Sequence, residues 1–161
     1  MISIQAKRIK EIKRSKRKLE KKLNIKIRFD KCDVLFEGES LDEYQASLIF
    51  EAINLGFSAE TALLILENEI TFETINIKDH TRRKNLLVVR GRLIGTRGKT
   101  KNTLEEISGC KIKIQDNIVG LIGHAENIKN ATTAITNIIR GSKQTNAYKY
   151  LERINTKKKK R

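Results

Sequence analysis

The residues best suited to chemistry lie in one basic, glycine-rich segment from Arg90 to Lys101, RGRLIGTRGKTK. Its Gly-Lys-Thr ending resembles a P-loop, but that motif follows a strand and needs a glycine where this sequence has Leu93. The segment instead fits a loop between two helices. Gly95 and Gly98 lack the Cβ atoms that would block close approach, and the next helix offers free N–H groups to an anion. A phosphodiester backbone suits such a loop.

Positive charge and apolar side chains flank the two glycines. Leu93 and Ile94 are expected to form an apolar floor for bases, and the neighbouring cations would contact phosphates. A bare GxxG is a weak signal, but one that follows an isoleucine and precedes a basic helix is much more specific. The candidate RNA-binding residues are Arg90, Arg92, Ile94, Gly95, Thr96, Arg97, Gly98, Lys99 and Lys101.

No other cluster of residues indicates catalysis or metal binding. Cys32 and Cys110 form no CxxC pair and have only His80 and His124 as possible co-ligands, which disfavours a disulfide framework or a zinc site. No Ser-His-Asp or paired-carboxylate arrangement is evident. We therefore predict a protein that is not an enzyme and holds no cofactor and no metal, with a nucleotide-hydrolysing enzyme as the alternative from another class.

The overall charge indicates a polyanionic partner. Lys and Arg outnumber Asp and Glu by 34 to 19, giving a net charge of +15. The eight aromatic residues, three Tyr and five Phe, are few for a protein that stacks bases on aromatic platforms. No apolar run is long enough to cross a bilayer, and the N-terminus has no signal-peptide core, so we predict a cytoplasmic protein without membrane contact.

The chain contains an internal repeat. Residues 9–67 align without gaps to residues 94–152, an offset of 85, with 14 identical pairs. The pairs include Gly38 with Gly123 at turns and Gly56 with Gly141 after helical patterns. We therefore predict two copies of one module.

Periodicity predicts the same element order in both copies, an α+β fold of the type β-α-α-β-β-α with an extra C-terminal helix. In the second copy the strands are expected at 71–79, 110–115 and 118–123, and the helices at 80–93, 99–108, 126–140 and 146–155. In the first copy a strand is expected at 2–5, the closing helix at 41–55 and the extra helix at 58–67.

The loop of the first copy differs from that of the second. At the offset of 85, Gly95 and Gly98 correspond to Lys10 and Lys13, so this loop is expected to lack the glycine clamp. Residues 29–80 carry 12 acidic side chains against two basic ones. The first module is therefore interpreted as a scaffold or a protein-binding surface, although the acids alternatively form only a solvated face.

The IGTRG sequence within this element order resembles a type I KH domain, whose GxxG loop clamps about four nucleotides of a single strand. The stretches RGRLIGTRGKTKNTLEEISGCKIKI, VGLIGHAENIKNATTAITNIIRG and AYKYLER resemble more narrowly the tandem-KH ribosome assembly factors called partner-of-Nob or Dim-two proteins, of the archaeal type. The resemblance implies two tandem type I KH domains: a degenerate one at 1–69, one with the GxxG loop at 70–155, and a basic disordered tail at 156–161.

The resemblance also implies a function. The chain would be a non-catalytic assembly factor that binds the single-stranded 3′ end region of small-subunit ribosomal RNA. The implied protein partners are the endonuclease that matures this RNA end, the rRNA dimethyltransferase and the alpha subunit of initiation factor two. The sequence departs from the family at 142–146, where SKQTN replaces a Pro-His-Gly-like segment. A KH-domain RNA adaptor of the exosome or of the transcription machinery is the alternative.

Overall fold

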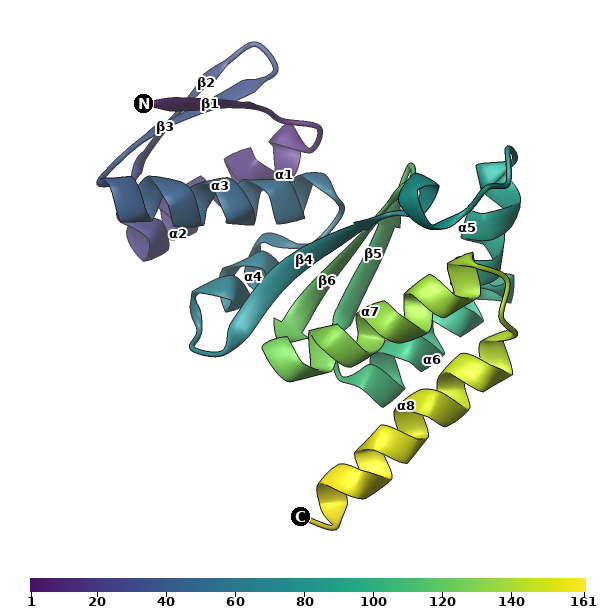
Figure 1. Cartoon of the computed structure of the whole chain (residues 1–161). Helices are drawn as coiled ribbons and strands as arrows, with labels where there is room; N and C mark the ends of the chain where they lie inside the picture. Colours follow the sequence, from purple (N-terminus) through teal and green to yellow (C-terminus); the bar gives the residue numbers. More distant parts are fainter. The chain divides into compact units, whose positions relative to one another are not determined.

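The computed structural model describes all residues, 1–161, and divides into two compact units, Met1–Phe72 and Glu73–Arg161. Each unit contains one three-stranded sheet with helices packed on it (Figure 1). The division falls within strand β4 (Ile70–Asn76). The fold is therefore a mixed α and β structure with two separate cores.

The first unit has a β-α-α-β-β-α order. Its sheet has the strand order β1-β3-β2 and is antiparallel, and Phe36 of the central strand pairs with Ile2 on one side and Ile27 on the other. The elements are β1 (Ile2–Gln5), α1 (Ile9–Arg14), α2 (Lys16–Leu23), β2 (Lys26–Asp30), β3 (Asp33–Glu37), α3 (Ser40–Asn54), α4 (Ala59–Leu63) and the 3-10 helix η1 (Leu64–Leu66).

The prediction of a loop at Lys10–Lys13 is wrong, because these residues lie within α1. The helices α1 and α2 are separated only by Ser15. Lysine, glutamate and isoleucine are all compatible with a helix, and without glycine nothing in this segment favours a left-handed turn. An alignment by residue identity does not detect this difference in backbone conformation.

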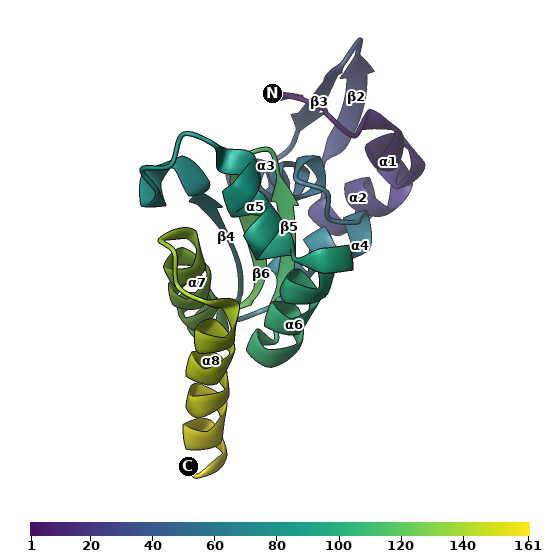
Figure 2. The same ribbon diagram turned by 90° about the vertical axis from the view of Figure 1, so that its right-hand side faces the viewer.

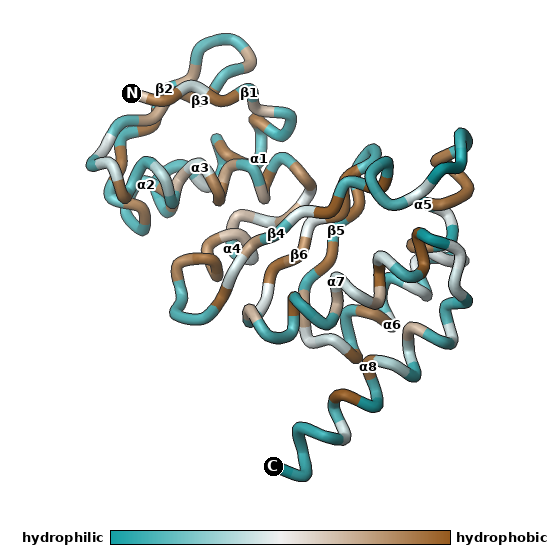
Figure 3. Tube along the Cα trace, in the orientation of Figure 1, coloured by the Kyte–Doolittle hydropathy of each residue, from teal (hydrophilic) through white to brown (hydrophobic).

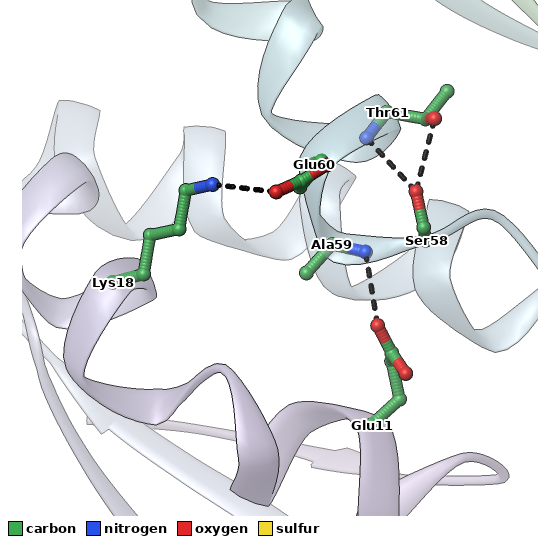
Figure 4. A network of polar contacts seen from close by, with 6 residues as sticks. All are labelled: Glu11, Lys18, Ser58, Ala59, Glu60 and Thr61. Carbon is green, nitrogen blue, oxygen red and sulfur yellow. Dashed lines mark hydrogen bonds and ion pairs between the residues drawn. The ribbon is translucent and has the colours of Figure 1, made fainter.

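Side chains of α1 and α2 hold the start of α4 (Figure 4). The carboxylate of Glu11 accepts a hydrogen bond from the backbone N–H of Ala59 at 3.3 Å, and Lys18 pairs with Glu60 at 3.2 Å. The Ser58 hydroxyl caps the helix by accepting from the N–H of Thr61 at 3.1 Å. The segment that was expected to be a loop therefore has a structural role in the first unit.

The second unit repeats this order around the sheet β4-β6-β5. The strands β5 and β6 are antiparallel, with Ile112 opposite Leu121. Its further elements are η2 (Ile77–His80), α5 (Leu86–Ile94), η3 (Thr96–Gly98), α6 (Lys99–Ser108), β5 (Lys111–Gln115), β6 (Ile118–His124), α7 (Ala125–Ile139) and α8 (Gln144–Lys159).

The core of the second unit lies between the sheet and the helices. Apolar residues concentrate along β6, whereas the C-terminal end of α8 is polar (Figure 3). The stripe of α7 that packs inward consists of Ile128, Ala131, Ala134, Ile135, Ile138 and Ile139, all at most 2% exposed. This stripe packs in one core with Val89 and Leu93 of α5 and Leu104 of α6.

The basic C-terminal residues continue a helix. Residues 156–161, predicted as a disordered tail, extend α8 as far as Lys159. The Asn155 side chain donates to the carbonyl of Ile107 at 2.8 Å, and the Lys158 ammonium donates to Asn127 at 2.7 Å. Lysines also suit the negative C-terminal end of a helix. None of the helices is both long enough and apolar enough to span a membrane.

Candidate functional site

The glycine-rich segment forms a tight turn between α5 and α6 (Figure 2). Three of the four residues Gly95–Gly98 have positive φ: Gly95 at 75°, Arg97 at 56° and Gly98 at 76°. The N–H groups of Gly95 and Gly98 donate within the turn, to the carbonyls of Gly91 and Gly95, so the donors offered to an anion are those at the start of α6. The predicted Gly-rich turn and the predicted bounds of α6, 99–108, agree with the structure.

The two glycines are needed for different reasons. A Cβ on Gly95 would lie 2.3 Å from the Thr100 hydroxyl oxygen and 2.7 Å from the Thr100 backbone nitrogen, so the loop packs directly on α6. A Cβ on Gly98 would meet only the Asn102 side-chain nitrogen, at 3.8 Å. Gly95 therefore permits close packing, whereas Gly98 supplies the left-handed conformation and leaves the surface open.

The first turn of α6 is open to an anion. Gly98 is its N-cap, and no side chain caps the helix. The N–H groups at a helix start lack intrahelical partners and carry partial positive charge. Two exposed cations, Arg97 and Lys99, lie beside them. The shallow surface depression at this point is lined by Thr96, Arg97, Lys99, Asn102, Thr103 and Glu106.

Three of these lining residues, Asn102, Thr103 and Glu106, escaped the sequence analysis. Asn102 and Thr103 lie three and four residues after Lys99, the spacing that puts side chains on one helix face. This spacing from Lys99 is the sequence signal that could have identified both residues. The amide of Asn102 adds a neutral donor and acceptor to a rim that also holds two cations, Glu106 and the hydroxyls of Thr96 and Thr103.

Arg92 is turned toward the protein. Its guanidinium donates to the carbonyl oxygen of Ile138 at 3.1 Å and to that of Ser142, so it caps the C-terminal end of α7. In the first unit Arg8 makes the equivalent pair of bonds, to the carbonyls of Ile53 and Phe57.

Three further residues of the segment also make protein contacts. Lys101 pairs with Glu105 at 3.3 Å, and Arg90 donates to the carbonyl of Asp116 at 2.9 Å. Leu93 is 1% exposed and belongs to the core, so it offers no floor for bases. The expectation for Leu93 is therefore wrong, and Ile94, which is half-buried, remains at the surface.

An exposed apolar stripe runs along α5 toward the loop. Leu87, Gly91 and Ile94 follow the spacing i, i+4, i+7, and Leu87 is 67% exposed. A Cβ on Gly91 would meet nothing within 4 Å, so packing within the protein does not require this glycine. A helical glycine costs about 1 kcal/mol of stability relative to alanine. The presence of glycine at this position is therefore better explained by the close approach of a ligand than by packing within the protein.

The cysteines and histidines are not gathered into a site. Burial raises the pKa of the Cys110 thiol, which keeps it protonated and unsuited to nucleophilic attack or metal binding. Cys32 is exposed in the first unit. His124 precedes α7 as its N-cap residue, and His80 ends η2. No group of three His, Cys, Asp or Glu side chains lies together in a way that could hold a metal ion.

Comparison with known proteins identifies the family. A model of the second KH domain of PNO1 proteins, described as a eukaryotic type KH domain (KH domain type I), matches residues 71–156. The crystal structure of Dim2p from Pyrococcus horikoshii OT3 is similar to this chain with a TM-score of 0.84 and 32% identity, covering 94% of this chain and 98% of that one. The chain belongs to the PNO1/Dim2 family of KH-domain proteins.

Two further comparisons support this assignment. A second Pyrococcus horikoshii structure, an a/eIF2alpha–aDim2p–rRNA complex, matches with a TM-score of 0.84 and 30% identity over 97% of this chain and 94% of that one. The KH domain-containing protein MJ0443 of Methanocaldococcus jannaschii is 30% identical over 145 residues, 86% of this chain. This chain spans 64% of the length of MJ0443.

Membership of the PNO1/Dim2 family makes the glycine-rich loop the GxxG loop of a type I KH domain. The family model covers the loop, the helices on either side of it and the sheet β4-β6-β5. In such domains this loop is the element that contacts a nucleic-acid backbone. The family assignment and the uncapped start of α6 therefore concern the same loop.

Proposed function

We propose that this protein binds single-stranded RNA through the GxxG loop and acts, without catalysis, as an assembly factor on the 3′ end region of small-subunit ribosomal RNA. The observation that carries this proposal is the loop itself, with three left-handed residues leading into an uncapped helix start between two exposed cations. That arrangement offers N–H donors and charge to phosphates while leaving room for a strand to approach.

The nine candidate residues divide into two roles. Thr96, Arg97, Gly98 and Lys99 contact the RNA backbone, and Ile94 contacts a base. Arg90, Arg92, Gly95 and Lys101 position the loop, because their side chains or backbone are engaged with α6, α7 or the β5–β6 turn. Contacts to phosphates fix the register of the strand, so most of the affinity should not depend on the base sequence.

Relatives support ribosomal RNA and an initiation factor as partners. The Pyrococcus Dim2p complex contains both rRNA and the alpha subunit of initiation factor 2. We infer that this chain binds the same two classes of partner. The endonuclease and the rRNA dimethyltransferase remain predictions from the family resemblance, and a cytoplasmic location remains a prediction from the sequence.

We also propose that both units are KH modules, a degenerate one at 1–69 and one with the GxxG loop at 70–155, followed by the basic tail at 156–161. Several local structures recur at the offset of 85. Glu20 accepts from the N–H of Ile27 at 2.8 Å, as Glu105 does from that of Ile112 at 2.9 Å. The other recurring features are the left-handed caps Asn24 and Gly109, the turn residues Lys31 and Asp116, the ion pairs Lys16–Glu20 and Lys101–Glu105, and the positive-φ pair Gly56 and Gly141.

The salt dependence of binding tests the proposed function directly. If about five phosphates are neutralised, the logarithm of the affinity for single-stranded RNA should fall with the logarithm of salt concentration at a slope of roughly −3.5, since each phosphate contributes about 0.7. Fluorescence anisotropy of a labelled oligonucleotide from the rRNA 3′ end region measures this slope. A slope near zero contradicts a phosphate-binding loop.

Gly91→Ala is expected to raise the stability of the free protein and to lower its affinity for RNA. In the free protein the substitution stabilises α5 by up to about 1 kcal/mol, because alanine is the better helix former and the added Cβ meets no neighbour. If the strand passes over the Leu87–Ile94 stripe, the same Cβ should weaken RNA binding several-fold. Urea denaturation and RNA titration measure the two effects. A more stable protein with unchanged affinity for RNA would show that Gly91 does not contact the RNA.

A further inference from the structure

A second basic hollow lies near the other end of α5. It is lined by five residues, His80, Thr81, Arg82, Arg83 and Arg140, which we call the arginine pocket. Four of them come from η2 and the connection into α5, and Arg140 comes from the C-terminal end of α7. None of them belongs to the GxxG loop or to the depression beside it. Figure 2 shows this connection reaching the N-terminal end of α5, opposite the loop.

The three arginines of the pocket have no acidic partner. Arg82, Arg83 and Arg140 form no ion pair, and their side chains make no hydrogen bond within the protein. By contrast, Arg8, Arg90 and Arg92 all donate to backbone carbonyls. Three guanidinium groups around one hollow repel one another, and a bound anion would offset this repulsion. The forked guanidinium is also the side chain best matched to a phosphate.

His80 supplies a second, independent observation. Its Nδ1 atom is buried and has no hydrogen-bond partner. Buried polar atoms are nearly always satisfied. A phosphate oxygen accepts hydrogen bonds, so it satisfies this nitrogen when Nδ1 carries the ring proton and the ring turns it toward the hollow.

The negative end of the α7 dipole lies beside the pocket and would by itself repel an anion. The carbonyl groups responsible are already occupied. The guanidinium of Arg92 donates to the carbonyls of Ile138 and Ser142, which places a positive charge on the helix end. The residues that face a bound anion are therefore the three arginines, with Lys84 next in sequence and Asp79 as the nearest acid along the chain.

We propose that the arginine pocket binds a second phosphate group of the RNA strand whose first phosphates are held at the GxxG loop. This inference rests on the proposed function. The helix α5 has nine residues and is therefore about 13 Å long, so one strand of several nucleotides reaches both ends. The apolar stripe of Leu87, Gly91 and Ile94 runs along the same helix. The pocket thus extends the binding site beyond the clamp of about four nucleotides.

The test compares two RNA lengths with charge-matched variants of the full chain. Arg82→Gln/Arg83→Gln removes two pocket charges, and Lys129→Gln/Lys149→Gln removes two exposed charges from α7 and α8 in the same unit. For a 12-nucleotide strand we expect the arginine variant to bind at least about tenfold more weakly. Its salt slope should be less steep by about 0.7, the contribution of the one phosphate held in the pocket. For a 4-nucleotide strand both variants should bind as the wild type does.

The outcomes separate the two proposals. If the arginine variant binds the 12-nucleotide strand as the lysine variant does, the arginine pocket is not an RNA site, whereas wild-type binding of the short strand still supports the proposed function. If the arginine variant loses the short strand as well, the pocket is not an extension of the clamp and the inference is overturned. If the wild type binds neither strand, the proposed function itself fails. Circular dichroism checks folding, which we expect to be unchanged because the replaced side chains are exposed and form no hydrogen bond or ion pair.

Discussion

Replacing Gly98 by aspartate is expected to weaken single-stranded RNA binding by about 2–3 kcal/mol, the cost of placing an uncompensated charge beside a phosphate. The fold should survive. Gly98 has φ 76° and ψ 12°, a left-handed conformation that aspartate tolerates better than most residues, and its Cβ would make only an ordinary contact with the Asn102 side chain. Titration with one labelled oligonucleotide measures the effect, and circular dichroism monitors folding.

Lys13→Asp is the matched control in the first unit. Lys13 is the residue aligned with Gly98, and it is exposed in α1 with its ammonium 5.4 Å from the centre of the Phe29 ring. Its replacement changes the charge further than Gly98→Asp does, yet we expect only a general electrostatic loss, because α1 has no clamp to break. Equal losses of affinity in the two variants would contradict the division of labour between the units.

Much of the second unit was predictable because its local signals agree with its tertiary structure. The bounds of α6 are those expected, since its apolar period ends at Gly109, which adopts φ 73° as a left-handed cap. The strands β5 and β6 are separated by the turn residues Asp116 and Asn117, as their composition indicates. The GxxG loop was likewise visible because Gly95 and Gly98 adopt positive φ, which favours glycine.

The side-chain contacts within the site were not predictable from the sequence. Arg92 and Arg97 are both arginines in the same basic segment, yet the first caps α7 and the second is exposed beside the loop. That difference depends on the approach of Ile138 and Ser142, which lie about fifty residues further along the chain. Charge alone indicates that a segment binds anions, but it does not indicate which of its cationic side chains form hydrogen bonds within the protein.

The arginine pocket was not predictable from the sequence for the same reason. Arg82 and Arg83 are adjacent in the sequence, but Arg140 joins them only because the end of α7 lies beside the connection into α5. In the sequence, Arg140 reads as an ordinary residue at the end of a helix. Sites assembled from separate elements carry no local pattern, so they emerge only when the packing of α5 and α7 is known.

Gly95→Ala is expected to destabilise the second unit by about 2–4 kcal/mol, which combines the strain of a conformation open mainly to glycine with the overlap of an overpacked site. Gly95 has φ 75° and ψ 174°, and the new Cβ would lie 2.3 Å from the Thr100 hydroxyl oxygen and 2.7 Å from its backbone nitrogen. A backbone atom at this distance does not move aside as the end of a flexible side chain does. The loop or the start of α6 must shift.

Gly98→Ala is the matched variant, because it adds the same methyl group at φ 76° without overlap. We expect it to cost about 1–2 kcal/mol, the strain of a left-handed residue alone. Urea denaturation followed by circular dichroism compares the two, and the first unit serves as an internal reference because neither change touches it. A similar cost for both variants would mean that the close approach of Gly95 to Thr100 does not hold the loop on α6. A clearly larger cost for Gly95→Ala would mean that the loop is preorganised by packing before any RNA arrives.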